Sequence, residues 1–354
     1  MRLGLMVGYW GSAKDTHAHS QLQLVQEAER LGYAVAWVAE AYGSDAPTVL
    51  AWLGAQTDRI DVGSAIMQIP ARTPAMTAMT AATLDSLTGG RFRLGLGVSG
   101  PQVSEGWHGV RFTDPLGRTR EYAEIVRRAL GRERLEYDGE HFTLPLPDGP
   151  GKALHLTIRP ERARIPLYLA AIGPKNLALT GEVADGWLPV FYIPEEAGGL
   201  HETVRAGREA AGRGRTLDGF DIAPSVPVSL GSDLEQAYDR VRPYAALYVG
   251  GMGSAKQNFY NRIAVRAGFA DEAATVQRLY LERRPRDAQA ALSHDFLDRT
   301  ALVGDRARIA DRLHRYAEAG VTTLCVAPYG ESLQQRLDTV RTMAELLDEQ
   351  GLAG

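Results

Sequence analysis

The sequence predicts an α/β fold: a parallel (β/α)8 barrel of the TIM type, formed by one chain of 354 residues. Short runs rich in β-branched and aromatic residues alternate with longer segments of helical periodicity, which is typical of successive βα units. Eight such runs can be placed, the number that closes a parallel barrel. An open doubly wound sheet is the alternative, but it usually has fewer strands. Because an α/β barrel extends over about 250 residues or more as one domain, the length does not require a second domain.

The elements follow one another in order. The expected strands are Leu3–Tyr9, Ala34–Glu40, Ile60–Gln68, Phe92–Ser99, Leu167–Ala171, Gly186–Phe191, Asp221–Leu230 and Thr323–Pro328. The expected helices are Ser20–Leu31, Pro47–Thr57, Pro74–Leu87, Leu116–Leu130, Asn176–Ala184, Glu195–Ala211, Ala307–Ala319 and Ser332–Gln350. Two segments interrupt the alternation. Arg132–Arg164, with its LPLPDGPGKA tract, predicts a hairpin and loop on the rim, and Ser232–Asp305 predicts a helical insertion between the seventh and eighth strands.

Composition narrows the function. A net charge of -4 and a pI near 6.1 argue against general nucleic-acid binding, which needs a basic face. No apolar run approaches the roughly 20 residues of a membrane span, and the start MRLGLMVGYWG lacks the features of a secretory signal. The single cysteine, Cys325, lies in the apolar run TTLCVAPY, so we expect a buried thiol and not a catalytic one. The scattered histidines show no zinc spacing. We expect a cytoplasmic protein without a metal.

The stretch GLGVSG fits the GxGxxG pattern and follows a strand. A dinucleotide fingerprint must also open a helix, and helical periodicity resumes only near Leu116, so this interpretation fails. Alternation along the strand places Gly95, Gly97 and Ser99 on one face. Their small size leaves room either for a ligand or for barrel packing, and at the strand's C-terminal end the ligand is favoured for Gly97, Ser99 and Gly100.

The stretch AAIGPKN joins the fifth strand to its helix. Pro174 suits the first turn of a helix, whose N-terminus then lies at the C-terminal end of a barrel strand. Free amides, the helix dipole and the Lys175 ammonium would together favour an anion there. An ordinary strand-to-helix turn is the alternative. The small residues Ala170 and Ala171 would let a flat ring lie against this strand end.

Several stretches together resemble one family. IGPKNLALTGEVADGW is similar to the fifth strand, helix and sixth strand of the luciferase-like monooxygenase superfamily, and RFRLGLGVSGPQVSEGWHG resembles the fourth-strand signature of its branch that uses the deazaflavin coenzyme F420. WVAEAYGSDA resembles its second-strand end, GSAIMQIPARTPAMTAMTAATLDSLTGGR its third strand and helix, and YVGGMGSAKQNFY its insertion. The resemblance covers nearly the whole chain in order, although some relatives bind FMN instead.

The resemblance implies that the coenzyme lies across the C-terminal mouth of the barrel. A non-prolyl cis peptide is expected at Ala65–Ile66, in a bulge of the third strand behind the deazaflavin ring. Lys175 would lie near the coenzyme phosphate. The implied coenzyme-binding residues are Ala65, Ile66, Ser99, Gly100, Gln102, Ala170, Ala171, Gly173, Pro174 and Lys175.

Candidate catalytic residues are Glu40 and His108. The family places an acidic residue near the ring at the position of Glu40, and a rim carboxylate that caps a loop is the alternative. An ordinary histidine pKa suits proton transfer, although a histidine in a WHG turn is often structural. Sugar-phosphate dehydrogenases of the family have a catalytic histidine where this chain has Ala41, and a lysine in the loop that here reads Leu188–Ile193 without one. Oxidation of a sugar phosphate is therefore disfavoured.

Aromatic residues at or near predicted strand ends indicate a pocket for an apolar or ring-shaped substrate, with rim packing as the alternative. They are Trp10, Tyr42, Trp187, Phe191 and Tyr192. The function predicted is hydride transfer between reduced F420 and an organic substrate, by reduction of a C=C, C=N or C=O bond. An FMN-dependent monooxygenase and a non-catalytic flavin-binding protein are the alternatives. The resemblance also implies a homodimer.

Overall fold

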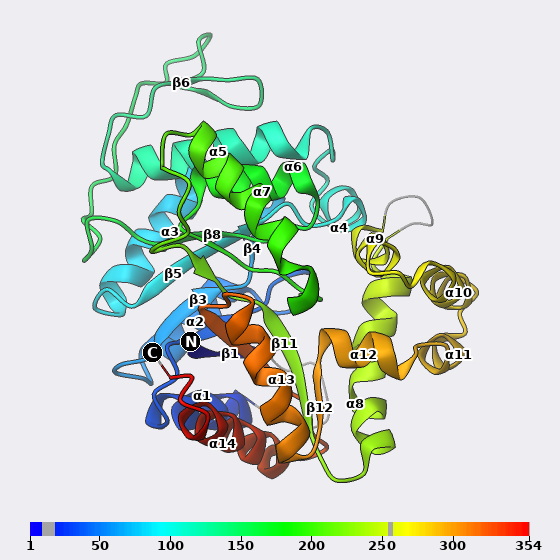
Figure 1. The fold of residues 1–354 in the computed structure, drawn as a ribbon. Coiled ribbons are helices and arrows are strands. Elements are labelled where there is room, and N and C mark those ends of the chain that lie inside the picture. The colour runs from blue at the N-terminus through cyan, green and yellow to red at the C-terminus, as the bar shows by residue number, and fades with distance from the viewer. Residues whose placement is uncertain (9–17, 254–257, 354) are drawn as a thin grey trace.

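A computed structural model describes residues 1–8, 18–253 and 258–353 (Figure 1). A parallel sheet forms the centre of the molecule, and its strands coincide with the eight expected runs. The strands are β1 (Arg2–Val7), β2 (Val35–Val38), β3 (Asp61–Ser64), β4 (Met67–Gln68), β5 (Phe92–Gly97), β8 (Leu167–Leu169), β9 (Gly186–Trp187), β10 (Asp221–Ile222), β11 (Ser225–Leu230) and β13 (Thr323–Pro328).

This sheet closes on itself. Its order is β10-β9-β8-β5-β3-β2-β1-β13-β11, with β4 also paired to β5. Only Ala223 and Pro224 separate β10 from β11, so the two are consecutive stretches of one strand. That strand pairs with β9 on one side, through β10 and a bridge between Val190 and Ser225, and with β13 on the other. The barrel predicted from the sequence is therefore confirmed.

Helices cover the outside of the barrel, and each expected helix is present within a few residues. They are α1 (Ala18–Arg30), α2 (Ala46–Gly54), α3 (Pro74–Leu87), α5 (Pro115–Leu130), α6 (Pro174–Val183), α7 (Ala197–Ala210, after the 3-10 turn Pro194–Glu196), α13 (Arg306–Glu318) and α14 (Leu333–Glu349). Their apolar faces form the main core against the outward strand residues. Within the described residues, no helix is both long and apolar enough to cross a bilayer.

The interior of the barrel is filled at its N-terminal end. Arg93 donates to Asp61 at 2.7 Å and to Asp221 at 3.2 Å, and Tyr168 donates to Asp221 at 2.9 Å. Above this network lies a small apolar cluster that includes Trp37 and Cys325. Cys325 is fully buried, as expected, and burial raises the pKa of its thiol. Because this end is plugged, the C-terminal mouth is left for chemistry, as in other α/β barrels.

Two excursions leave the barrel, both where the sequence places them. A hairpin of β6 (Tyr137–Asp138) and β7 (Thr143–Leu144) extends from the rim, at the top of Figure 1. The insertion contains α8 (Leu234–Ala246), a π-helix (Leu247–Gly251), α9 (Phe259–Arg266), α10 (Ala270–Leu281), α11 (Pro285–Ala290), α12 (His294–Thr300) and a strand that the sequence did not indicate, β12 (Leu302–Gly304). β12 pairs with the end of β11.

The insertion has its own apolar core and lies beside the barrel in Figure 1. It also reaches the loops at the mouth. Arg266 of α9 donates to the Ile172 carbonyl, between β8 and α6, at 3.2 Å. The ring of Phe259 lies 6.4 Å from that of Phe112, in the loop before α5. The insertion therefore contacts the mouth on the side of β5 and β8.

Candidate functional site at the C-terminal mouth

The third strand is interrupted at the mouth. β3 ends at Ser64, the Ala65–Ile66 peptide bond is cis, and β4 resumes at Met67. Ala65 and Ile66 are half-buried and pack with Ala170 on the interior cluster, so they form part of the floor of the mouth. The cis bond expected from the resemblance is present.

The glycines of β5 make room for this interrupted strand. A Cβ at Gly95 would lie 1.9 Å from the backbone oxygen of Ser64, and one at Gly97 would lie 2.9 Å from the Ile66 side chain. The expectation that Gly97 leaves space for a ligand is therefore wrong, because Ile66 fills that space. Among the described residues, no atom lies within 4 Å of a Cβ placed at Gly8 or Gly173. The described residues thus leave space at the start of α6, after β8, whereas the end of β1 adjoins residues 9–17, which lie outside the described part of the chain.

Glu40 follows β2 and holds the mouth together. Its Oε1 accepts hydrogen bonds from the Ala46 amide at 3.1 Å and from Arg72 Nη2 at 2.7 Å. Its Oε2 accepts from the Gln68 amide at 3.1 Å and from Arg72 Nη1 at 2.7 Å. The Glu40 side chain is 5 % exposed and that of Arg72 15 %, so this is a buried two-pronged ion pair. Arg72 also pairs with the more exposed Asp45.

Gln68 and Arg72 are functional candidates that the sequence reasoning missed. The buried Gln68 amide donates to the Ala41 carbonyl at 2.6 Å and accepts from the Ser99 hydroxyl at 3.0 Å. Ser99 itself has a φ of 60°, which turns the chain sharply after β5. The one sequence signal was a glutamine within the apolar run IMQIP. Through Gln68, the ends of β2, β4 and β5 form one polar network.

Two helices begin at the mouth without a side-chain cap. A helix α4 (Pro101–Gly106) starts directly after β5, and α6 starts directly after β8, the neighbour of β5. Their N-caps are Gly100 and Gly173, so their first amides are free of a capping side chain. No helix was expected between the end of the fourth strand, Ser99, and Leu116, and α4 corrects this. Lys175 is exposed in the first turn of α6. Neighbouring free helix N-termini and a lysine favour an anion.

The two remaining candidates after β5, Gln102 and His108, make no described hydrogen bond or ion pair with the polar network of Glu40, Gln68 and Ser99. His108 is half-buried, and its buried Nε2 has no hydrogen-bond partner among the described residues. Gln102 is exposed on α4.

Comparison with known proteins identifies the family. Residues 2–323 match the family described as luciferase-like monooxygenase. The chain belongs to this family. It is 43% identical to a Mycobacterium tuberculosis protein named as a coenzyme F420-dependent oxidoreductase, Rv3520c. The alignment extends over 331 residues, which are 92% of this chain and 94% of that protein. It is 26% identical to the 5,10-methylenetetrahydromethanopterin reductase of Archaeoglobus fulgidus, over 89% of this chain and 92% of the reductase.

Solved structures agree on the fold. The coenzyme F420-dependent tetrahydromethanopterin reductase from Methanopyrus kandleri superposes with a TM-score of 0.81 at 23% identity, covering 97% of each chain. An F420-dependent secondary alcohol dehydrogenase in complex with an F420-acetone adduct gives a TM-score of 0.77 at 19% identity, covering 98% of this chain and 99% of that one. These likenesses support the luciferase-like barrel.

Two of the aromatic residues assigned to a substrate pocket belong to the core between strands and helices. Trp187 is 3% exposed and donates through Nε1 to the Ala171 carbonyl at 2.9 Å. Tyr192 is 2% exposed, and its hydroxyl bonds His201 of α7 at 3.0 Å. Ala171 packs in the same outer core and is 2% exposed. The pocket assignments of Trp187 and Tyr192 are therefore wrong, and the side chain of Ala171 does not line the mouth.

The other three aromatic candidates have different outcomes. Phe191 packs in the core of the insertion, 5.4 Å from the ring of Tyr244, and its place in a substrate pocket stays a prediction. Tyr42 is 62% exposed after β2. Burial and the nearby Tyr42 together raise the pKa of Tyr280 in α10, which indicates that this loop faces the insertion. Trp10 lies outside the described residues.

Proposed function

We propose that this luciferase-like family member is an oxidoreductase that transfers a hydride between reduced coenzyme F420 and an apolar or ring-containing organic substrate. The reaction proposed is reduction of a C=C, C=N or C=O bond. The observation that carries the proposal is the mouth itself, where half-buried apolar side chains of the interrupted third strand share one end of the barrel with two helix N-termini that have no side-chain cap. The relatives named as F420-dependent enzymes support the same choice of coenzyme.

The residues present fit a deazaflavin with an acidic tail. A flat ring system needs an apolar wall, and Ala65, Ile66 and Ala170 provide one that is half-buried before any ligand binds. The open space at Gly173 lies at the start of α6, where the free amides and the exposed Lys175 would attract a phosphate. Gly100 offers a second such start at α4.

The bound coenzyme would supply the hydride chemistry, and the protein would supply binding, orientation and proton handling. Each carboxylate oxygen of Glu40 already accepts two hydrogen bonds, so we assign Glu40 as a positioning residue and not as a proton donor. It fixes the Gln68 backbone next to the Ala65–Ile66 floor, and Gln68 in turn orients Ser99. His108 Nε2 has no hydrogen-bond partner within the described part of the chain, which supports this residue as the donor or acceptor of the proton that accompanies hydride transfer.

A sugar phosphate is a poor candidate substrate. The chain is 28% identical over 259 residues, 69% of its length and 74% of that protein, to an F420-dependent glucose-6-phosphate dehydrogenase of Amycolatopsis mediterranei. Ala41 cannot act as a base, and the loop after β9, Leu188–Ile193, has no cation for a substrate phosphate. The chemistry of that relative therefore does not transfer to this chain.

The test is a titration of the purified protein with F420 and, separately, with FMN, followed by ligand fluorescence at fixed salt. We expect F420 to bind selectively. Lys175→Ala should weaken F420 binding about fivefold, as loss of one exposed charge contact of about 1 kcal/mol would do. Lys152→Ala removes an equally exposed lysine from the rim loop and should have no effect. Selective FMN binding would move the proposal to the monooxygenases, and binding without turnover of any substrate would indicate a binding protein.

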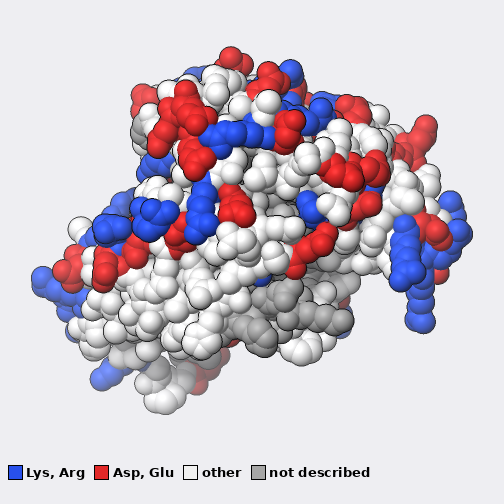
Figure 2. Space-filling view, turned by 90° about the horizontal axis from the view of Figure 1, so that it is seen from below, with Lys and Arg blue, Asp and Glu red and all other residues white. Residues whose placement is uncertain are grey.

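We also propose a homodimer. Helix α2 contains no charged residue, and the one in α3, Asp85, is buried. The outer face of α3 exposes Met76, Met79 and Leu87 to between 50% and 67%. Figure 2 shows a broad expanse without Lys, Arg, Asp or Glu in the lower part of its view. Light scattering after chromatography should give a dimer for the native protein and a smaller species for Met79→Asp; an unchanged mass would contradict this interface.

A cytoplasmic location is proposed as well. It is supported by the single, fully buried cysteine, since a chain with one such thiol needs no oxidising compartment for an internal disulfide. Fractionation of the native host should recover the protein with cytoplasmic markers.

A further inference from the structure

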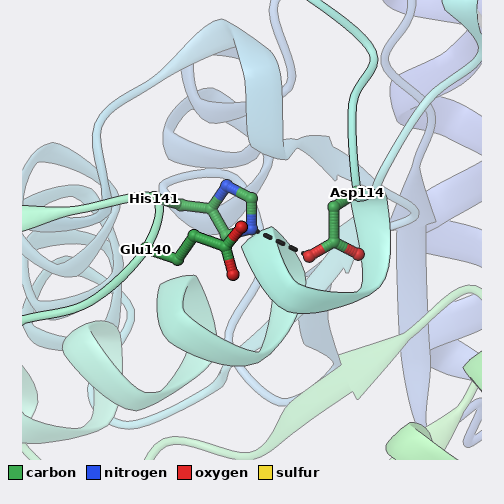
Figure 3. A group of neighbouring side chains, drawn as sticks. All are labelled: Asp114, Glu140 and His141. Atoms are coloured by element: carbon green, nitrogen blue, oxygen red, sulfur yellow. Dashed lines mark hydrogen bonds and ion pairs between the residues drawn. The ribbon is translucent and has the colours of Figure 1, made fainter.

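Three potential ligands meet on the rim, away from the mouth network. Asp114 is the N-cap of α5, and Glu140 and His141 lie in the turn between β6 and β7 (Figure 3). His141 Nε2 lies 3.0 Å from Asp114 Oδ2. One ligand atom from each of the three residues lies within 4.8 Å of the others. The cluster therefore joins two segments that are separate in the sequence.

The backbone holds the ligands in place. Glu121 of α5 accepts hydrogen bonds from the amides of Glu140 at 2.8 Å, His141 at 2.9 Å and Phe142 at 3.0 Å. The side chain of His141 is only 10% exposed, so its ring is fixed by packing as well. Asp114 uses Oδ1 to cap the Gly117 amide, which leaves Oδ2 pointing to the imidazole. Two of the three ligands are thus oriented in advance.

The charge of the cluster is not balanced within the protein. Two carboxylates face one imidazole, and none of the described residues donates a hydrogen bond or forms an ion pair to the Glu140 carboxylate. A cation placed among the three groups would gain one ligand atom from each of them.

We propose that Asp114, Glu140 and His141 bind one divalent transition-metal ion of the zinc class. An imidazole with two carboxylates suits zinc, whereas magnesium and calcium prefer oxygen ligands throughout. Ligands at about 2.0–2.2 Å from zinc lie about 3.3–3.6 Å apart in tetrahedral geometry. His141 Nε2 and Asp114 Oδ2, now 3.0 Å apart, would therefore separate by only a few tenths of an ångström on binding. Glu140 is exposed and reaches the ion by rotating its side chain. Water would take the fourth position.

Gly117 leaves the space that two of the ligand atoms occupy. A Cβ on this residue would lie 2.0 Å from Asp114 Oδ2 and 2.9 Å from His141 Nε2. Gly117 is in the first turn of α5, where alanine is a better helix former than glycine. The missing side chain therefore leaves space for the two ligand atoms at a position where helix propensity alone favours alanine.

The bound ion would fasten the β6–β7 hairpin to the start of α5. That helix follows the loop that carries His108, so the ion would brace the mouth from outside without touching it. The inference is independent of the proposed reaction, because it concerns metal binding by the protein without coenzyme or substrate.

Isothermal titration of the metal-free protein with zinc chloride tests the proposal, with cobalt(II) absorption as a second readout of ligand geometry. We expect one ion per chain, at least tenfold weaker binding in Glu140→Gln, and no site in His141→Gln. Gly117→Ala keeps all three ligands and should also lose the site. His294→Gln is the matched control, since His294 pairs with one carboxylate, Glu235, at 2.9 Å and belongs to no such group of three in the described part of the chain. Circular dichroism verifies that each variant is folded.

Hydrogen exchange of residues 137–144 should slow when zinc is added to the native protein and should not change in Gly117→Ala. Absence of zinc binding by the native protein would overturn the proposal. So would binding that persists undiminished in both His141→Gln and Gly117→Ala, because the ion would then lie elsewhere.

Discussion

Replacement of Glu40 by glutamine tests the network at the mouth. Each carboxylate oxygen accepts one backbone amide and one guanidinium N–H. In either orientation the glutamine NH2 group would face two other donors, and the buried guanidinium of Arg72 would lose its main counter-charge. Loss of one partner of a buried pair costs about 3–5 kcal/mol. Because Arg72 keeps Asp45, we expect the lower end, about 3 kcal/mol.

That free energy converts to a measurable shift in melting temperature. The entropy of unfolding is about 2.1 cal/mol/K per residue, which for this chain gives about 0.7 kcal/mol/K. Glu40→Gln should therefore lower the Tm of the ligand-free protein by about 4 °C in calorimetry. Asp45→Asn is the control: Asp45 pairs with the same arginine, its side chain is 49% exposed, and asparagine also caps helices well, so the shift should stay within about 1 °C. A Tm for Glu40→Gln within 1 °C of the native value, or equal shifts in both variants, would refute this reasoning.

Other expectations concern stability and reactivity. Gly95→Ala should lower the free energy of unfolding by about 3 kcal/mol or more, since its Cβ would lie 1.9 Å from the Ser64 oxygen. Gly173→Ala should change the free energy of unfolding by less than about 0.5 kcal/mol, because no described atom lies within 4 Å of its Cβ. Similar urea midpoints for the two variants would contradict this expectation. Hydrogen bonds from Arg30 and Arg341 lower the pKa of Glu27 from 4.5 to about 2. The ionised Glu27 therefore stabilises the folded protein above pH 4.5, and this stabilisation disappears as the pH falls towards 2. Between pH 6 and pH 3, the free energy of unfolding measured in urea should fall less for Glu27→Gln than for the native protein. The Cys325 thiol, fully buried and with a raised pKa, should resist a disulfide reagent until the protein unfolds, and rapid labelling of the native state would show that the barrel interior is open.

The barrel was predictable because burial repeats along the sequence. Strands covered on both faces appear as apolar runs, and helices packed on one side show a 3.6-residue period, so Pro74–Leu87 was found with its observed ends. The helix α4 was missed because six residues between a proline and a glycine are too few to show a period. Short helices of this kind are defined by their N-terminal turn and not by an apolar face.

The site was predictable only where a local motif marks it. The Gly-Pro starts and the Ala65–Ile66 segment lie within single stretches, whereas the bonds of Glu40 to Gln68 and Arg72 span 28 and 32 residues and leave no local pattern. Trp187 was assigned to a substrate pocket at the mouth, but it faces the helices outside. A Cβ at Gly186 would meet the Tyr168 ring inside the barrel, and because successive residues of a strand point to opposite faces, Trp187 points outward. Phe191 adopts a φ of 49°, which is rare for a bulky residue, so the turn of the backbone at this position could not be predicted from the sequence.

The contact between Gly97 and Ile66 has a consequence for how this barrel tolerates change. The space that Gly97 leaves is occupied by a side chain from the neighbouring strand, so the two positions share one volume. A larger residue at 97 would be accepted only with a smaller one at 66, and each single substitution would be selected against while the pair survives. The two positions should therefore covary, and a variant library built one residue at a time would miss the combinations that reshape the floor of the mouth.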